Sequence, residues 1–93
     1  MASAPTLVVA EDADGNFVVK ITDGKLGTTH VVSVPSGFGP SIGLAGTSDE
    51  DLVRVCFLFL LDREPATSIL ASFSLDVISR YFPEYRREIG KYI

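Results

Sequence analysis

The chain has 93 residues, of which 46% are apolar and 22% are charged, a composition typical of one globular domain rather than a disordered segment. Its formal net charge of -4 at pH 7 argues against a broad surface for binding polyphosphates. The only cysteine, Cys56, has no partner for an internal disulfide and lies in an apolar run, which predicts a buried, reduced thiol.

The beginning of the sequence, Met1 to Pro5, has no basic region followed by an apolar one, so no signal peptide is evident. The apolar run 52–61 is about half of what a membrane span needs. We therefore expect a soluble, cytoplasmic protein that does not enter a membrane.

The first third has the pattern of a three-stranded antiparallel meander. Three runs rich in β-branched and aromatic residues predict strands over 6–10, 17–22 and 28–34. Asp14 and Gly15 are typical of a hairpin turn between the first two, and 23–27 supplies the second turn. In the middle run Phe17, Val19 and Ile21 alternate with other residues, so one face is apolar and needs helices across it.

Residues 35–46 contain four glycines and two prolines and are expected to connect the sheet to the helices. Their glycines match neither the dinucleotide fingerprint nor a P-loop. Near Thr47 the spacing of apolar residues changes from every 2 residues, typical of strands, to about every 3.6 residues, typical of helices. This change indicates an α+β fold. We predict one domain over 1–93, with a meander at 6–34 followed by three or four helices within 47–93 that pack on one face of it.

The central helix is predicted over 48–62. Thr47 and Glu50 have the spacing of a capping box, and the acidic first turn suits the helix dipole. Pro65 disfavours helical geometry at the residue before it and so ends the helix. The side expected to face the core carries Leu52, Val53, Val55, Cys56, Phe59 and Leu60.

A second apolar side of this helix carries Phe57, Leu58 and Leu61 next to Arg54. Either the later helices of the chain cover it or it is a surface for self-association, because aromatic and aliphatic residues beside an arginine are typical of interface cores. A chain this short has little material to cover both sides. We therefore expect a homodimer, or a complex with another protein, that uses Arg54, Phe57, Leu58 and Leu61.

Two short helices are predicted at 66–73 and 75–82, with a last helix after Pro83. This outline fits a helix-turn-helix DNA-binding regulator, which is the alternative function. The side chains that would contact nucleic acid are Arg80, Arg86, Arg87 and Lys91. Acidic residues dilute this cluster, and DNA affinity depends mainly on phosphate neutralisation, so nucleic acid is not the expected partner.

Nothing in these residues points to catalysis, a metal or a cofactor. Asp12, Asp14 and Asn16 resemble the start of a calcium loop, but Phe17 stands where that loop needs glycine, so we expect a turn. His30 has no second histidine with which to form a transition-metal site. We expect a protein that is not an enzyme and that holds no cofactor.

The segment from Phe59 to Tyr85, which covers the last third or so of the chain, resembles part of small bacterial proteins of uncharacterised function. The resemblance implies no activity, cofactor or catalytic residue. Together these observations predict a small cytosolic interaction or regulatory module, homodimeric through helix 48–62.

Overall fold

The first third of the chain forms the predicted antiparallel meander. In the computed structural model, which describes residues 6–92, the strands are β1 (Thr6–Glu11), β2 (Phe17–Asp23) and β3 (Leu26–Ser33). Val19 of β2 lies opposite Val9 of β1 and His30 of β3, so these three residues share one face. The predicted ranges are confirmed to within about two residues at each end, the usual uncertainty of strand limits.

The acidic segment between β1 and β2 is a turn, as predicted. The Asp12 carboxylate accepts hydrogen bonds from the backbone N–H groups of Asp14 at 2.9 Å and Asn16 at 3.0 Å. Gly15 has a φ of 82°, in the left-handed region that other residues rarely adopt. The oxygen-rich pattern therefore satisfies backbone donors of the turn.

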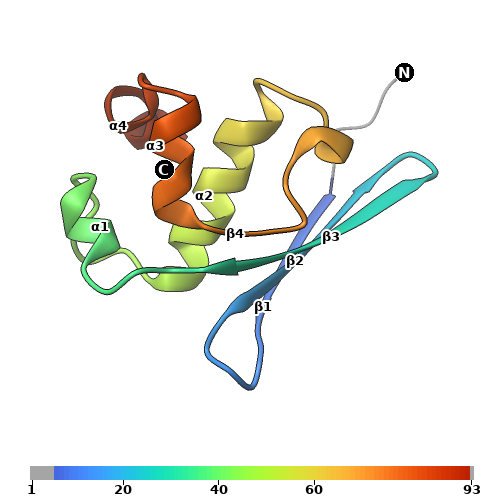
Figure 1. The fold of residues 1–93 in the computed structure, drawn as a ribbon, viewed down its shortest axis with the longest axis horizontal. Helices are drawn as coiled ribbons and strands as arrows, with labels where there is room; N and C mark the ends of the chain where they lie inside the picture. The colour runs from blue at the N-terminus through green and yellow to red at the C-terminus, as the bar shows by residue number, and fades with distance from the viewer. Residues whose placement is uncertain (1–5, 93) are drawn as a thin grey trace.

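A fourth strand, β4 (Ser72–Ser74), extends the sheet in the order β1-β2-β3-β4 and runs parallel to β3 (Figure 1). The predicted helix over 66–73 is therefore wrong, and only a short 3-10 turn, η1 (Ala66–Ser68), forms there. The backbone N–H of Val31 donates to the Ala71 carbonyl at 2.8 Å. Pairing with β3 outweighs the local helical pattern, because helix propensity is a weak preference that tertiary contacts override.

The central helix, α2, spans Asp49–Leu61, close to the prediction. Its N-cap is Ser48, whose hydroxyl accepts a hydrogen bond from the Asp51 N–H at 3.2 Å, so the capping box expected at Thr47 is wrong by one residue. The remaining helical elements are α1 (Phe38–Ser41), η2 (Leu75–Val77), α3 (Ile78–Tyr81), α4 (Tyr85–Glu88) and η3 (Ile89–Tyr92). The predicted helix 75–82 thus begins as a 3-10 turn and continues as α3.

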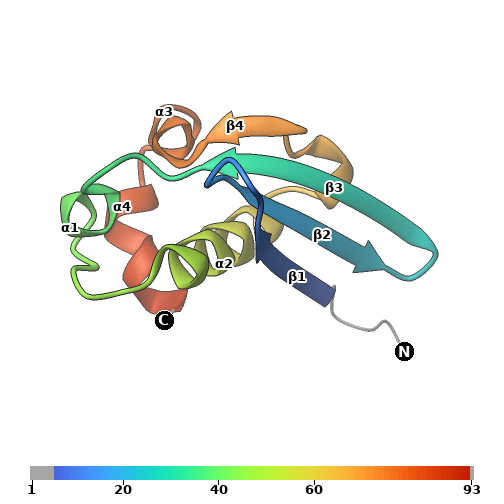
Figure 2. The same cartoon turned by 90° about the horizontal axis from the view of Figure 1, so that it is seen from below.

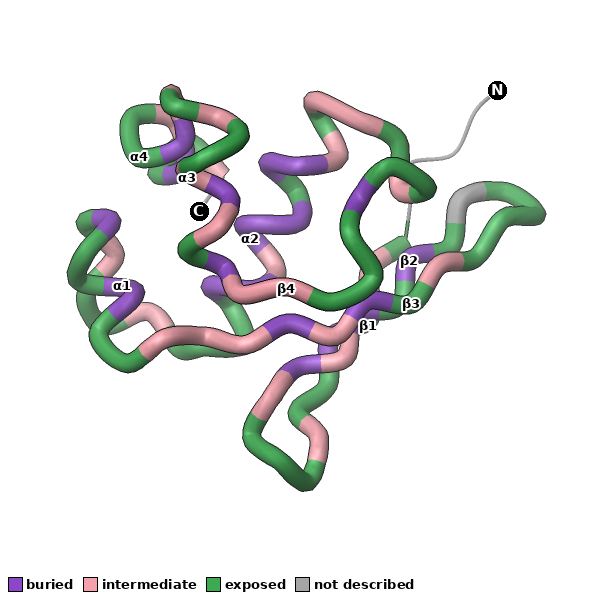
Figure 3. Tube along the Cα trace, in the orientation of Figure 1, coloured by how far each residue is buried: buried purple, intermediate pink, exposed green. Residues whose placement is uncertain are grey.

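The core lies around α2, which crosses the apolar face of the sheet on one side and meets the C-terminal segment on the other (Figures 1 and 2). All six residues predicted for its core face are buried (Figure 3). They pack against Val19 and Ile21 of the sheet and against Tyr85 and Ile89 of the C-terminal segment. The Cα radius of gyration, 12.7 Å, is near the ~12 Å expected for one domain of this length.

The opposite face of the sheet carries exposed residues, including Val8, Lys20 and Thr29, which lie side by side across β1, β2 and β3. No helix between residues 6 and 92 has the length and apolar character needed to cross a membrane.

Candidate interaction surfaces

Phe57, expected on the dimer face of α2, is inside the protein. Its exposed fraction is 0%, and its ring centroid lies 5.5 Å from that of His30 and 5.8 Å from that of Phe73. The prediction that Phe57 faces a second copy is therefore wrong. The physical reason is β4, which brings Phe73 over this side of α2 and which the sequence pattern did not indicate.

The other three residues of the predicted dimer face reach the surface but form a small patch. Leu58 is 39% exposed, whereas Leu61 is half-buried and packs against the core. The Arg54 guanidinium lies 2.9 Å from the Asp51 carboxylate and 3.5 Å from that of Glu50. This side of α2 thus presents one exposed large apolar side chain, well below the apolar core of a stable interface.

The basic residues of the DNA-binding alternative lie on the C-terminal helices. Arg80, Arg86 and Arg87 are exposed, and the Lys91 ammonium pairs with the Glu88 carboxylate at 2.6 Å. That pair holds the pKa of Glu88 below its ordinary value. Because 66–73 contains a strand, the two consecutive helices that a helix-turn-helix requires are not formed.

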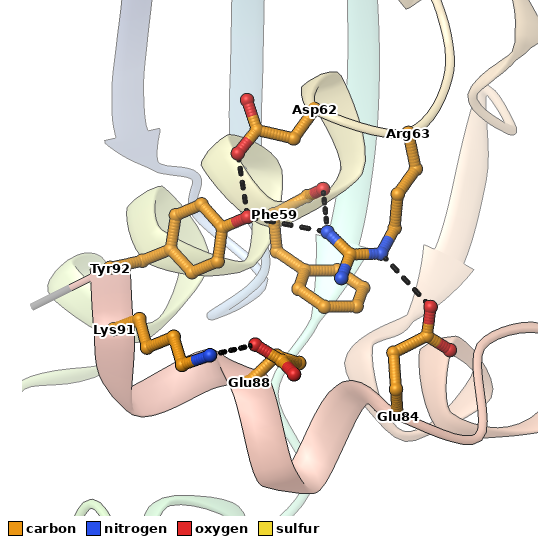
Figure 4. A network of polar contacts seen from close by, with 7 residues as sticks. All are labelled: Phe59, Asp62, Arg63, Glu84, Glu88, Lys91 and Tyr92. Carbon is orange, nitrogen blue, oxygen red and sulfur yellow. Dashed lines mark hydrogen bonds and ion pairs between the residues drawn. The ribbon is translucent and has the colours of Figure 1, made fainter.

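Arg63, just beyond α2, ties the C-terminal segment to that helix (Figure 4). Its guanidinium donates to the Glu84 carboxylate at 3.2 Å, to the Phe59 carbonyl at 3.3 Å and to the Tyr92 hydroxyl at 3.2 Å. It also lies 3.6 Å above the centre of the Phe59 ring, while the Tyr92 hydroxyl donates to Asp62 at 2.6 Å. Sequence reasoning missed this cluster because its members are 21 and 29 positions apart.

Cys56 is a structural thiol. Its sulfur lies 2.8 Å from the Tyr85 hydroxyl oxygen, and both side chains are fully buried. Burial raises the pKa of Cys56 to about 12 and raises the pKa of Tyr85 as well. The thiol therefore stays protonated and unreactive at neutral pH, which confirms the predicted buried thiol.

His30 is also structural. It is 2% exposed, its Nδ1 donates to the Leu70 carbonyl at 2.7 Å, and its Nε2 lies 2.9 Å from the Thr28 hydroxyl. Both ring nitrogens are therefore occupied: the bond to Leu70 joins β3 to the segment before β4, and the contact with Thr28 lies within β3. Within residues 6–92, no three His, Cys, Asp or Glu residues are grouped so as to hold a metal ion.

One motif was missed at the level of sequence. Residues 39–43, Gly-Pro-Ser-Ile-Gly, have the G-x-S-x-G spacing of a hydrolase nucleophile. Ser41 ends the one-turn helix α1, and its hydroxyl donates to the Phe38 carbonyl at 2.6 Å. A nucleophile elbow needs a strand directly before the serine and a histidine as base, whereas the only histidine is bonded to Leu70 and Thr28. The motif therefore has the geometry of a turn.

An apolar pocket of about 320 Å³ lies between the end of α2, η1, β4 and α3. We call it the Leu70–Tyr81 pocket; its lining includes Leu60, Glu64, Ser68, Leu70, Phe73 and Tyr81. Leu70 and Tyr81 are 50% and 65% exposed, large values for apolar side chains. The sequence did not predict this pocket, because it exists only where β4 and the end of α2 meet.

The outer edge of β1 is a second candidate surface. β1 pairs with β2 along its whole length, and no other strand among residues 6–92 pairs with it. Edge strands are commonly protected by lysine, proline or a bulge. Residues 6–10 contain none of these and no charge, and Val8 at the centre is 56% exposed.

Over residues 6–92 the fold defines a small α+β domain with two candidate surfaces, the outer edge of β1, which no described strand pairs with, and the Leu70–Tyr81 pocket beside β4. Comparison with protein-family models, with curated proteins and with solved structures found no match to this chain.

Proposed function

We propose that the protein is a small interaction module that forms a homodimer by antiparallel pairing of β1 with β1 of a second copy. The observation that carries this proposal is the outer edge of β1, which pairs with no strand among residues 6–92 and carries no charge over 6–10. Pairing would satisfy its backbone N–H and C=O groups and join two four-stranded sheets into one.

The sequence of β1 suits a two-fold antiparallel arrangement. With Val8 on the axis, Val8 lies opposite Val8 of the second copy, Leu7 opposite its Val9, and Thr6 opposite its Ala10. Opposed residues then share a face, so the half-buried Leu7 extends the core and the exposed Val8 gains an apolar neighbour. Residues 6–10 carry no charge, so this pairing places no like charges opposite each other along that stretch, as a self-complementary interface requires.

Sedimentation equilibrium from low to high micromolar concentration tests this arrangement. We expect the mass to rise toward twice the 10.0 kDa of one chain. Val8→Lys should raise the dimer dissociation constant by at least about tenfold, since it places two like charges opposite each other at the axis. Val8 points away from the core, so the variant should keep the wild-type circular dichroism.

Thr29→Lys is the matched control. Thr29 is exposed on the same face of the sheet but lies on β3, two strands away from β1, so the same added charge should leave the dimer intact. A monomeric wild type at the highest concentration, or equal effects of the two lysines, would refute the β1 interface.

Leu58→Glu distinguishes a dimer that uses β1 from a dimer that uses the outer side of α2. The β1 arrangement predicts an unchanged dimer in this variant, whereas an interface through Arg54, Leu58 and Leu61 predicts a monomer. We also propose that the module has no catalytic activity. We place it in the cytoplasm, where a reduced thiol such as the buried Cys56 is stable.

A further inference from the structure

We infer that the Leu70–Tyr81 pocket binds a segment of a partner protein in which a large apolar side chain is adjacent to a lysine or arginine. The pocket volume, about 320 Å³, is at the lower end of the range of ligand sites and suits one such side chain. This site is independent of the dimer proposed above, because β4 and β1 are opposite edges of the sheet.

The apolar part of the assignment comes from the lining. Leu60, Ile69 and Phe73 form the inner wall, and Leu70 and Tyr81 remain largely exposed at the rim. Interfaces are enriched in such aromatic and aliphatic anchors around a pocket that an inserted side chain can fill. An apolar side chain from a partner would remove both rim residues from water.

The basic part of the assignment comes from Glu64. It is the only one of the ten lining residues that is charged at neutral pH, and it is half-buried. Its carboxylate forms no ion pair with any residue of the described range, in contrast to Glu84 and Glu88, which pair with Arg63 and Lys91. A cation beside the inserted side chain would complement this carboxylate, and the net charge of -4 favours the approach of a basic segment.

The test uses the ¹⁵N-labelled full chain and two blocked tetrapeptides, acetyl-Ala-Phe-Lys-Ala-amide and acetyl-Ala-Phe-Glu-Ala-amide, in NMR titrations. Both peptides should shift amide signals within 68–73 and 77–82, and the lysine peptide should bind about three- to fivefold more tightly, as expected for a partly exposed ion pair. The difference should shrink at high salt. Equal affinities, or shifts located elsewhere, would overturn the assignment.

Two matched variants locate the recognition. Glu64→Gln should bind the two peptides equally, whereas Glu11→Gln, which removes the same charge from β1, should keep the preference for lysine. Leu70→Ser should weaken both peptides without unfolding the chain, because Leu70 is half exposed. A preference that survives in Glu64→Gln would refute the role of this carboxylate.

Phenethylamine, which has an aromatic ring and an ammonium group but no peptide backbone, distinguishes a peptide site from a site for a small amine. The inference predicts that it binds more weakly than the lysine peptide. Equal or tighter binding of phenethylamine would overturn the assignment to a protein partner. None of these outcomes depends on whether the chain dimerises through β1.

Discussion

Cys56 and Tyr85 form a buried polar pair joined by one hydrogen bond, with 2.8 Å between the sulfur and the hydroxyl oxygen. Removing either group from water disfavours its charged form, which is why burial raises both pKa values. At neutral pH both groups are therefore uncharged and compatible with the core, and the pair lowers the stability of the fold only in alkaline solution.

This pair predicts a loss of stability at high pH. The folded pKa of Cys56, about 12, lies above the ordinary value of 9.0, so over this range the folded chain keeps a proton that the unfolded chain releases. The contribution is fully present below about pH 9 and is lost as the pH rises toward 12, with a slope that approaches about 1.4 kcal/mol per pH unit for one group. Tyr85 acts in the same direction. Urea unfolding between pH 7 and pH 11 measures this slope, which should be shallower in Cys56→Ala; a flat profile would contradict the prediction.

Two neighbouring residues of α2 should differ sharply in their effect on stability. Phe57→Ala removes a ring that is 0% exposed and should lower the free energy of unfolding by about 3–5 kcal/mol. Leu58→Ala alters a side chain that is 39% exposed and should cost less than about 1 kcal/mol. Urea midpoints of the two variants provide the comparison, and similar losses would mean that Phe57 is not covered by β4.

At the scale of elements, the C-terminal segment is held to α2 by Arg63, whose guanidinium joins an α2 carbonyl, a carboxylate and a phenol (Figure 4). The hydrogen bond from its own backbone N–H, together with the hydrogen bond and charge of Arg63, holds the pKa of Glu84 below its ordinary value. Short helical elements such as α4 and η3 have little stability of their own, so their place depends on such contacts.

Arg63→Ala should therefore lower the free energy of unfolding by about 1–2 kcal/mol, because several hydrogen bonds and the contact with the Phe59 ring are lost together. Arg54→Ala is the control: it removes an arginine whose two ion pairs are exposed, and it should cost less than about 0.5 kcal/mol. Urea unfolding of both variants at pH 7 measures the difference. Equal costs would show that the Arg63 contacts do not stabilise the C-terminal segment.

At the scale of the whole molecule, the sheet has two dissimilar edges. β4 pairs with residues 31–33 at the end of β3 and forms one wall of the Leu70–Tyr81 pocket, whereas no strand within the described residues pairs with the outer side of β1. Pairing of two copies through β1 would leave both pockets accessible on a single assembly. Such a dimer could hold two basic segments at once, with a gain in avidity if one partner carries both.

The sequence by itself determined the three antiparallel strands, the turn at Asp12 and the buried side of α2. The reason is that the spacing of apolar residues within a short segment indicates which side of a strand or helix is buried. It did not determine β4, the burial of Phe57, the Arg63 contacts or the pocket. The strand β1 was predictable, but its position at an edge follows from the order of strands. Each of these features depends on residues far apart in the chain, such as His30 and Leu70, which are 40 positions apart. Only packing in three dimensions brings such pairs together, and it can turn a segment with local helical character into a strand because the pairing free energy exceeds a weak local preference.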